Sequence, residues 1–565
     1  MEKRVILFLI LSMALIVLYP YVMDKMGLTK RPQPARPQKE THAPTPAINP
    51  STPSSAPQLS TPAASGERRL LPEIPAVPTK GSTREQEVTV ETDLIRVVFS
   101  NRGGVIKSWE LKRYHTQDDK NPKEIQLVPS KSATGPLMPP LEVQVADPKL
   151  QQRLNQGLYQ VSTTSLSLTE AQPTGEIEFS YSDPETGARV DKRLSFSNGT
   201  YLVDLRLQSS GISGPSILNL GTNFGIHKWE EGFVGFIGPA TLISGKLDKA
   251  TPEKEDIRTG QVAWAALQDK YFVAAAIPAD ELAHQVVVRK EGDKLVSVGL
   301  QTQAVTDNVS SHYRLFIGPK EYETLKGLQV GLEDTIDFGW FIYGSWSIVR
   351  AVAKPVFYTI RYLYDITHNY GVAIILVTVG IKLLLAPLAY KSYRSMKQMS
   401  AVQPELQALQ KKHADDRERL NKELIKLYKD KKVNPVGGCL PMFFQIPVFV
   451  ALFNILYMTI ELRQAPFMLW IKDLSVQDPY YVLPILMGGT MFIQQKIQPT
   501  TMDPKQAQIM LILPVFLTFL FVTFPAGLVL YWLTNNVLTI LQQVITDRYL
   551  LPKASVPATS QASRA

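Results

Sequence analysis

Lys382 is the residue with the clearest chemical potential, because it stands inside an apolar run from Tyr370 to Leu388. A charged side chain within hydrocarbon is costly, and it therefore indicates a functional site unless a partner neutralises it. Lys391, at the basic end of the run, lies about 13 Å away along a helix, farther than a lysine side chain fully reaches. The later apolar runs contain no carboxylate that could pair with Lys382. We therefore infer a hydrated cavity around Lys382, open toward that basic end.

Further polar residues lie within the same apolar runs. Thr378 stands one helical turn before Lys382, and Asn535, Thr539 and Gln542 follow an i, i+4, i+7 pattern in the last run. Gln445 lies in a run between them. Amides in hydrocarbon must be hydrogen-bonded or wet, so ordinary interhelical hydrogen bonding is the alternative to a polar groove. That alternative accounts well for Gln445 and poorly for Lys382.

The residues that commonly carry enzyme chemistry are scattered. The seven histidines stand singly without metal-ligand spacing, and the single cysteine, Cys439, excludes an intrachain disulfide. The segment Gly238–Lys246 is too long for a phosphate-binding loop and lacks the following Ser or Thr. We therefore expect no enzymatic activity, no cofactor and no metal. The net charge of +9 arises from cations beside apolar runs rather than from a nucleic-acid-binding patch, so no direct nucleic-acid binding is expected.

The N-terminal region is predicted to anchor the chain in a membrane. Lys3 and Arg4 precede an apolar run over residues 5–23, which is long enough to cross a bilayer. Tyr19-Pro20-Tyr21 replaces the small residues of a cleavage site, so residues 1–23 are interpreted as a retained anchor rather than a signal peptide. The basic pair places the N-terminus in the cytoplasm. Residues 24–82 are a Pro-rich periplasmic linker with too little apolar surface for a core.

Residues 83–335 alternate apolar and polar positions in short segments, which predicts a large periplasmic all-β sandwich. The clearest hairpin joins Arg193–Ser197 to Tyr201–Leu205 through Asn198-Gly199, a pair typical of a type I′ turn. Sandwiches often bind carbohydrate, but no acidic pair or aromatic cluster marks a sugar site here. A spacer or docking surface is the favoured interpretation.

The remaining chain is predicted to be an α-helical polytopic membrane region. Dense aromatics over 336–353 indicate an interfacial amphipathic helix. Within a core at 354–549, apolar runs predict spans at about 370–390, 440–460, 480–493, 509–524 and 526–544, the last two joined tightly at Pro525. The basic segment 391–439 is cytoplasmic by the positive-inside rule. With the anchor, this gives six transmembrane helices, both termini cytoplasmic, and a short tail at 550–565.

The cytoplasmic segment carries helical periodicity over 395–432, which predicts a helical hairpin. Asp415 and Glu418 have capping-box spacing for its second helix. The charged turn, Asp415, Asp416 and Glu418, is either a partner-docking platform or a solvated connector, and the sequence favours neither.

Five longer segments share a common resemblance. They are Asn434–Pro441, Gln445–Pro447, Glu461–Phe467, Asp478–Gly488 and Phe524–Trp532. The sequence resembles, over these motifs, the YidC branch of the YidC/Oxa/Alb insertase family, in the Gram-negative form with an extra first span and a periplasmic β-supersandwich. The resemblance implies a five-helix insertase core with a hydrophilic groove that carries one basic residue.

Lys382 occupies the position of that basic residue, where many relatives have arginine, and Thr378 matches a groove threonine of the family. With the resemblance, the predicted substrate groove consists of Lys382, Thr378, Gln445, Tyr531, Trp532, Asn535, Thr539 and Gln542. The implied partners are nascent inner-membrane proteins, the Sec translocon, the signal recognition particle pathway and ribosomes, within the lipid bilayer. The tail holds only Lys553 and Arg564 as cations, which does not favour ribosome binding through the tail.

The sequence therefore predicts an ATP-independent insertase and chaperone of the bacterial inner membrane. A small-solute channel or transporter is the alternative, although neither internal repeats nor paired carboxylates are evident. A membrane-anchored glycan-binding protein would explain the sandwich but not the polar groove.

Overall fold

The computed structural model describes residues 81–116, 121–129, 137–229, 236–280, 282, 284–302, 308–336, 347–413, 416–434, 440–498 and 512–550. The predicted N-terminal anchor, nearly all of the linker, the aromatic residues 338–346, Asp415, Cys439 and residues 551–565 lie outside this part of the chain. Strands occupy the described chain up to Pro319, and long helices follow from Ser347.

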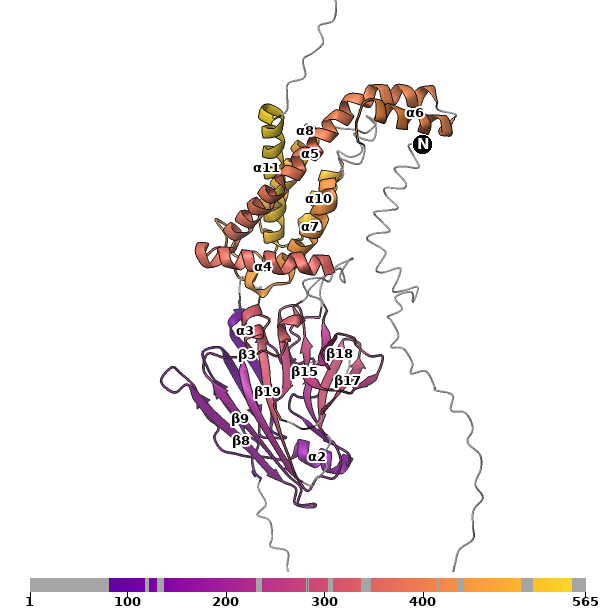
Figure 1. The fold of residues 1–565 in the computed structure, drawn as a ribbon. Coiled ribbons are helices and arrows are strands. Elements are labelled where there is room, and N and C mark those ends of the chain that lie inside the picture. The colour runs from indigo at the N-terminus through magenta and orange to yellow at the C-terminus, as the bar shows by residue number, and fades with distance from the viewer. Residues whose placement is uncertain are drawn as a thin grey trace, which may run out of the picture. The chain divides into compact units, whose positions relative to one another are not determined.

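The β-region contains three sheets (Figure 1). The first has the order β4-β3-β2-β1-β7, the second β13-β12-β15-β16-β19-β10-β9-β8-β6, and the third β14-β17-β18-β11-β5. The strands are β1 Glu87–Glu91, β2 Ile95–Ser100, β3 Val105–His115, β4 Glu124–Gln126, β5 Val143–Val145, β6 Gln160–Val161, β7 Ser165–Ser167, β8 Thr174–Ser182, β9 Arg189–Ser197, β10 Leu202–Ser210, β11 Ser216–Thr222, β12 Gly238–Ile243, β13 Lys246–Asp248, β14 Glu255–Arg258, β15 Val262–Gln268, β16 Phe272–Pro278, β17 His284–Gly292, β18 Leu295–Thr302 and β19 Asn308–Pro319. Helix α2, Pro148–Gln156, follows β5.

The two five-stranded sheets cover one face of the nine-stranded sheet. Strand β10 shows why, because Val203, Leu205 and Leu207 are buried and the residues between them point outward. On the covered side, Phe99 of the first sheet packs against Phe179 of the second. Tyr313, which pairs with Leu205 in register, lies against His284 of the third sheet. The resulting core confirms the predicted β-sandwich.

The predicted hairpin is present, but its turn is not type I′. Strands β9 and β10 pair in antiparallel register, with Phe196 opposite Val203 nearest the turn. Only Gly199 of the expected pair has positive φ, at 74°, whereas a type I′ turn needs positive φ at both central residues. The Asn198 side chain instead donates to the Asp93 carboxylate at 2.5 Å and accepts from the Asp93 backbone N–H. Those tertiary bonds fix Asn198 in another conformation.

Several helical segments follow the β-region, and some of them form the walls of the candidate site. They are α3 Tyr322–Gly327, η1 Leu332–Thr335, α4 Ser347–Thr367, α5 Tyr370–Lys412, α6 Arg417–Asp430, α7 Leu440–Met458, η2 Ile460–Leu462, α8 Val482–Ile497, α10 Leu513–Phe521, α11 Ala526–Ile545 and the π-helical turn η3 Thr546–Leu550. Helix α11 packs against both α5 and α8, and α10 packs against α8 (Figure 1).

Helix α5 is continuous where the sequence predicts a span followed by a separate cytoplasmic helix. It begins at Tyr370, is capped by Asn369, whose side chain accepts from the Val372 N–H, and ends at Lys412. The helix α6 that pairs with its far end is capped by Asp416, which accepts from the Arg419 N–H at 3.0 Å. The predicted cap at Asp415 was therefore wrong by one residue, because periodicity fixes a helix face more tightly than its first residue.

Two described helices are long and apolar enough to cross a membrane by length and composition, Tyr370–Gln410 and Ala526–Leu550. The surface of the helical region adds a second observation. Large apolar side chains are exposed along α5, α8 and α10, among them Leu383, Leu384, Ile485, Val515 and Phe519. Such contiguous exposed apolar surface is costly in water and is typical of contact with lipid or another apolar partner.

Candidate functional site

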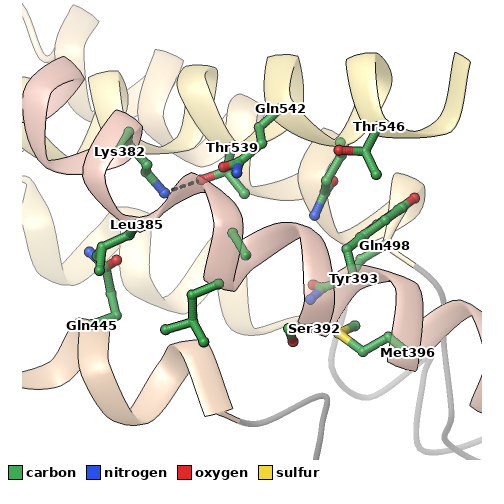
Figure 2. Close-up of a pocket in the computed structure, with 13 residues that line it drawn as sticks. Lys382, Leu385, Ser392, Tyr393, Met396, Gln445, Gln498, Thr539, Gln542 and Thr546 are labelled. Atoms are coloured by element: carbon green, nitrogen blue, oxygen red, sulfur yellow. Dashed lines mark hydrogen bonds between the residues drawn. The ribbon is translucent and has the colours of Figure 1, made fainter. Parts of the chain in front are cut away.

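A cavity of about 210 Å³ lies among α5, α7, α11 and the end of α8. We call it the groove cavity and define it by its lining residues, Lys382, Leu385, Leu388, Ala389, Ser392, Tyr393, Met396, Gln445, Gln498, Thr539, Gln542, Gln543 and Thr546. Figure 2 shows that most of these side chains come from two facing helices, α5 and α11. The volume is far above the 10–15 Å³ that one water molecule requires.

Lys382 is the charged residue of this lining. Its Nζ donates to the Thr539 hydroxyl at 2.8 Å, so the bond links α5 to α11 (Figure 2). Thr539 in turn donates to the Asn535 carbonyl at 2.6 Å, which fixes its hydroxyl beside the helix. None of the carboxylates in the described residues forms an ion pair with Lys382. An ammonium with one neutral hydroxyl partner gains further stabilisation from water or from a visiting acceptor.

Helical spacing places the lining on matching faces. On α11 the lining residues Thr539, Gln542 and Gln543, with Thr546 beyond them, recur every three or four positions. On α5 the same spacing runs from Lys382 through Leu385 and Ala389 to Ser392 and beyond. Each helix therefore presents one stripe to the cavity: the α5 stripe is apolar just after Lys382 and polar at Ser392 and Tyr393, whereas the α11 stripe is polar throughout.

The structure brings together four of the eight predicted groove residues, Lys382, Gln445, Thr539 and Gln542. Gln542 donates to the Ala386 carbonyl at 3.5 Å, which also joins α11 to α5. Tyr531 is buried beside this set, where its hydroxyl accepts from Gln445 at 3.4 Å.

The other three predicted residues do not line the cavity. Thr378 is buried and donates back to the Ile374 carbonyl of its own helix at 2.6 Å. Trp532 packs edge-on against Phe449 and Phe521. The Asn535 Oδ1 is buried without a hydrogen-bond partner among the described residues.

The sequence prediction missed the end of the cavity that lies toward the basic segment. Ser392, Tyr393 and Met396 belong to it and lie beyond the predicted span of about 370–390, because the apolar run stops before them. Their spacing from Lys382 continues the same helical stripe, so the periodicity could have identified them had α5 been extended. Gln498 follows α8 and carries no comparable signal in the sequence.

Metal chemistry has no support in the described residues, where no group of three or more His, Cys, Asp or Glu side chains could hold an ion. The groove cavity instead presents one cation and several amides and hydroxyls, and it has room for several water molecules inside an apolar helical region. It can solvate and attract a polar or acidic group. It presents no activated nucleophile next to a base.

Comparison with known proteins then identifies the family. Residues 87–358 match the family model described as the YidC periplasmic domain, and residues 362–553 match the model described as the 60Kd inner membrane protein. A protein of Syntrophus aciditrophicus named membrane protein insertase YidC is 36% identical over 97% of this chain and 100% of its own length. The chain belongs to the YidC family. A YidC insertase of Geotalea daltonii is 39% identical over the same shares of the two chains.

Among solved structures, an active YidC insertase with its first transmembrane domain resolved covers 84% of this chain and 95% of its own. The sequence identity is 20% and the TM-score is 0.34, so the assignment to the YidC family rests on the sequence matches. The first family model covers the strands and ends within α4, and the second covers the helices from there on, which confirms a YidC periplasmic β-sandwich domain followed by a helical region.

Proposed function

We propose that this protein is a membrane protein insertase and chaperone that works without ATP. Its groove cavity accepts the polar segment of a nascent inner-membrane protein, while the apolar segment enters lipid beside it. The observation that carries this proposal is Lys382, a cation inside an apolar helix, with one hydroxyl partner and a cavity at its side. The relatives that are named insertases support the same function.

The physical basis is a lower barrier for desolvation. Moving a polar or acidic segment into hydrocarbon costs several kcal/mol for each unsatisfied group. A cavity lined by Lys382, Gln445 and Gln542 supplies hydrogen-bond partners and space for water at that depth. Hydrophobic burial of the substrate's apolar helix then drives the overall step, and the membrane potential adds to it for charged segments.

The proposal includes six membrane spans, with both termini in the cytoplasm and the β-domain in the periplasm. Two helices of membrane length and the exposed apolar side chains of α5, α8 and α10 support it. The cations of residues 391–432 support the cytoplasmic side for that segment. A cysteine replacing Ser51 should react with an impermeant reagent added from the periplasm, and one replacing Ala414 should not. Cys439 must first be replaced by serine.

The proposed partners are the Sec translocon, the signal recognition particle pathway and translating ribosomes. The cytoplasmic hairpin of α5 and α6 is the proposed docking platform. Asp416 is already engaged as the α6 cap. Glu418 is exposed, and its ion pair with Lys422 at 2.8 Å is of the kind that contributes little to stability, so it remains available to a partner.

Reconstitution tests the function directly. The purified protein in liposomes should insert a one- or two-span substrate without ATP, scored by protease protection of the translocated segment. The same liposomes should retain a trapped small solute, because an insertase needs no continuous pore. Solute leakage without insertion would favour a channel and contradict the proposal.

A further inference from the structure

Asp547 adjoins the rim of the groove cavity. Its carboxylate accepts from the Tyr393 hydroxyl at 2.5 Å and forms an ion pair with Lys397. Tyr393 and Thr546, its neighbours in space and in sequence, both line the cavity. Asp547 also lies in the π-helical turn η3, a local irregularity that often marks functional sites.

The charge of Asp547 is exceptional in its surroundings. It is the only carboxylate of α11 and η3, and α5 contains none before Glu405. The nearby cytoplasmic part of α5 exposes the cations Lys391 and Arg394. These cations and the exposed Arg548 beside Asp547 repel a basic segment of another chain, and Asp547 supplies the attraction on this wall.

The ion pair is of a kind that another cation can replace. The side chains of Lys397 and Asp547 are 49% and 35% exposed, and exposed pairs of this type contribute about 1 kcal/mol at most. Tyr393 is buried, so its hydroxyl holds the carboxylate in place when Lys397 leaves. An incoming Lys or Arg finds an acceptor that is already oriented.

Lys382 and Asp547 place opposite charges at two depths. Thr539, the partner of Lys382, precedes Asp547 by eight residues of sequence, or about 12 Å along a helix. The positive site lies inside the helical region, and the negative site lies at its basic end. This order complements a substrate whose translocated segment is acidic and whose retained flank is basic.

We propose that Asp547 is a specificity-determining residue that receives the basic residues flanking a substrate's membrane segment on the cytoplasmic side. The inference rests on the proposed insertase function. In this exchange Lys397 leaves the carboxylate, a Lys or Arg of the substrate takes its place, and no covalent bond changes. The protein thereby favours substrates, and orientations of substrates, that keep positive charge in the cytoplasm.

The test uses the full-length protein in liposomes and single-span substrates that differ only in the flank, Lys-Lys, Arg-Arg or Gln-Gln. The measured quantity is the flank ratio, the translocated fraction with a basic flank divided by that with the Gln-Gln flank. Asp547→Asn keeps an acceptor for Tyr393 but removes the charge, and it should lower the flank ratio by up to about fivefold, the effect of one exposed ion pair. Lys397→Met frees the carboxylate and should raise the ratio. Asp547→Glu should retain it.

The matched control is Glu405→Gln, which removes an ion pair of similar exposure between Glu405 and Lys431, away from the cavity. It should leave the flank ratio unchanged. If Asp547→Asn and Lys397→Met change insertion equally for all three flanks, Asp547 merely ties α5 to α11 and the inference is overturned. If the wild-type protein inserts none of the three substrates, the insertase proposal itself fails, which is a separate outcome.

Discussion

Lys192 of the β-domain is buried and Lys382 of the helical region is half-buried, and the two regions surround these lysines differently. In the β-domain the Lys192 Nζ donates to the carbonyls of Gly103, Gly104 and Leu141 at 2.7, 3.1 and 2.7 Å. In the helical region Lys382 donates to one hydroxyl and lines a cavity. An ammonium has three protons, so Lys192 has used its hydrogen-bonding capacity and Lys382 has not.

This difference separates a cation whose donors are all engaged from one that keeps unused donors beside a cavity. Lys192 joins β9 to the turn between β2 and β3, so it stabilises the packing of the first sheet on the second. Lys382 leaves donors for water or for a substrate's carboxylate. Burial of a charge alone does not indicate function; the unused donors and the adjacent space do.

The largest expected effect comes from changing Lys382. Two charges about 4 Å apart interact by about 4 kcal/mol at an effective dielectric near 20, and about 1.4 kcal/mol already changes a rate tenfold. Lys382→Glu and Lys382→Met should each slow insertion of substrates with acidic translocated tails by at least about tenfold. Lys382→Arg should be nearly silent. Rates are measured by protease protection in liposomes, at matched protein amounts.

Substrates with neutral translocated tails test whether Lys382 acts through its charge or by keeping the cavity hydrated. Lys382→Glu should spare them more than Lys382→Met does, because glutamate keeps the cavity wet. Normal insertion of every substrate by Lys382→Met would refute the hydrated-groove mechanism and make the two lysines equivalent in having no direct role.

Changing Lys192 should lower the stability of the β-domain and leave the insertion rate nearly unchanged, the opposite of what is expected for Lys382. Lys192→Met leaves three buried carbonyl oxygens without their donor, which should destabilise the β-domain by about 2–4 kcal/mol. Hydrogen exchange of peptides within residues 87–319 measures this loss in the full-length protein. Insertion at low temperature should remain close to the wild-type rate. Lys246→Met, at an exposed position of β13, is the control and should change neither quantity.

A smaller effect is expected in the pH dependence of the stability of the β-domain. Burial lowers the pKa of Lys192 from its ordinary 10.5 to about 7, against the opposing attraction of Glu142. Between these two values the unfolded state binds more protons than the folded state, so stability should rise from pH 7 to pH 10.5. Below pH 7 this group adds no further slope. Denaturant midpoints of wild type and Lys192→Met, compared at pH 7.5 and 9, isolate the contribution; an identical slope in both proteins would contradict it.

The smallest effect is expected from removing most of the β-domain. Lys192 and its neighbours share no polar site with the groove cavity, so deletion of about residues 60–310 should leave insertion close to the full-length rate. The segment from Phe338 onward is retained. A correctly embedded deletion protein that failed to insert substrates would show that the β-domain takes part in the mechanism.

Local patterns determined much of the helical region in advance. The apolar run around Lys382 and the i, i+4, i+7 pattern of α11 follow from a period of 3.6, so they place Lys382, Thr539 and Gln542 before any fold is known. Apolar periodicity did not predict that α5 continues through Ser392 and Tyr393, because the run of apolar residues ends before them. Asn198-Gly199 likewise predicted a hairpin, but hydrogen bonds between Asn198 and the distant Asp93 determine the conformation of its turn.

The sequence by itself determined the alternation of the strands, the apolar runs and an unpaired lysine within one of them. Only the tertiary structure decided that Leu202 pairs with Phe316, more than a hundred residues away, and that Thr539 meets Lys382. It also decided that Lys192 is buried, although its position between Asp191 and Arg193 is typical of a surface residue. The physical reason is that periodicity is a property of neighbouring residues, whereas burial and pairing depend on segments that the chain brings together only on folding.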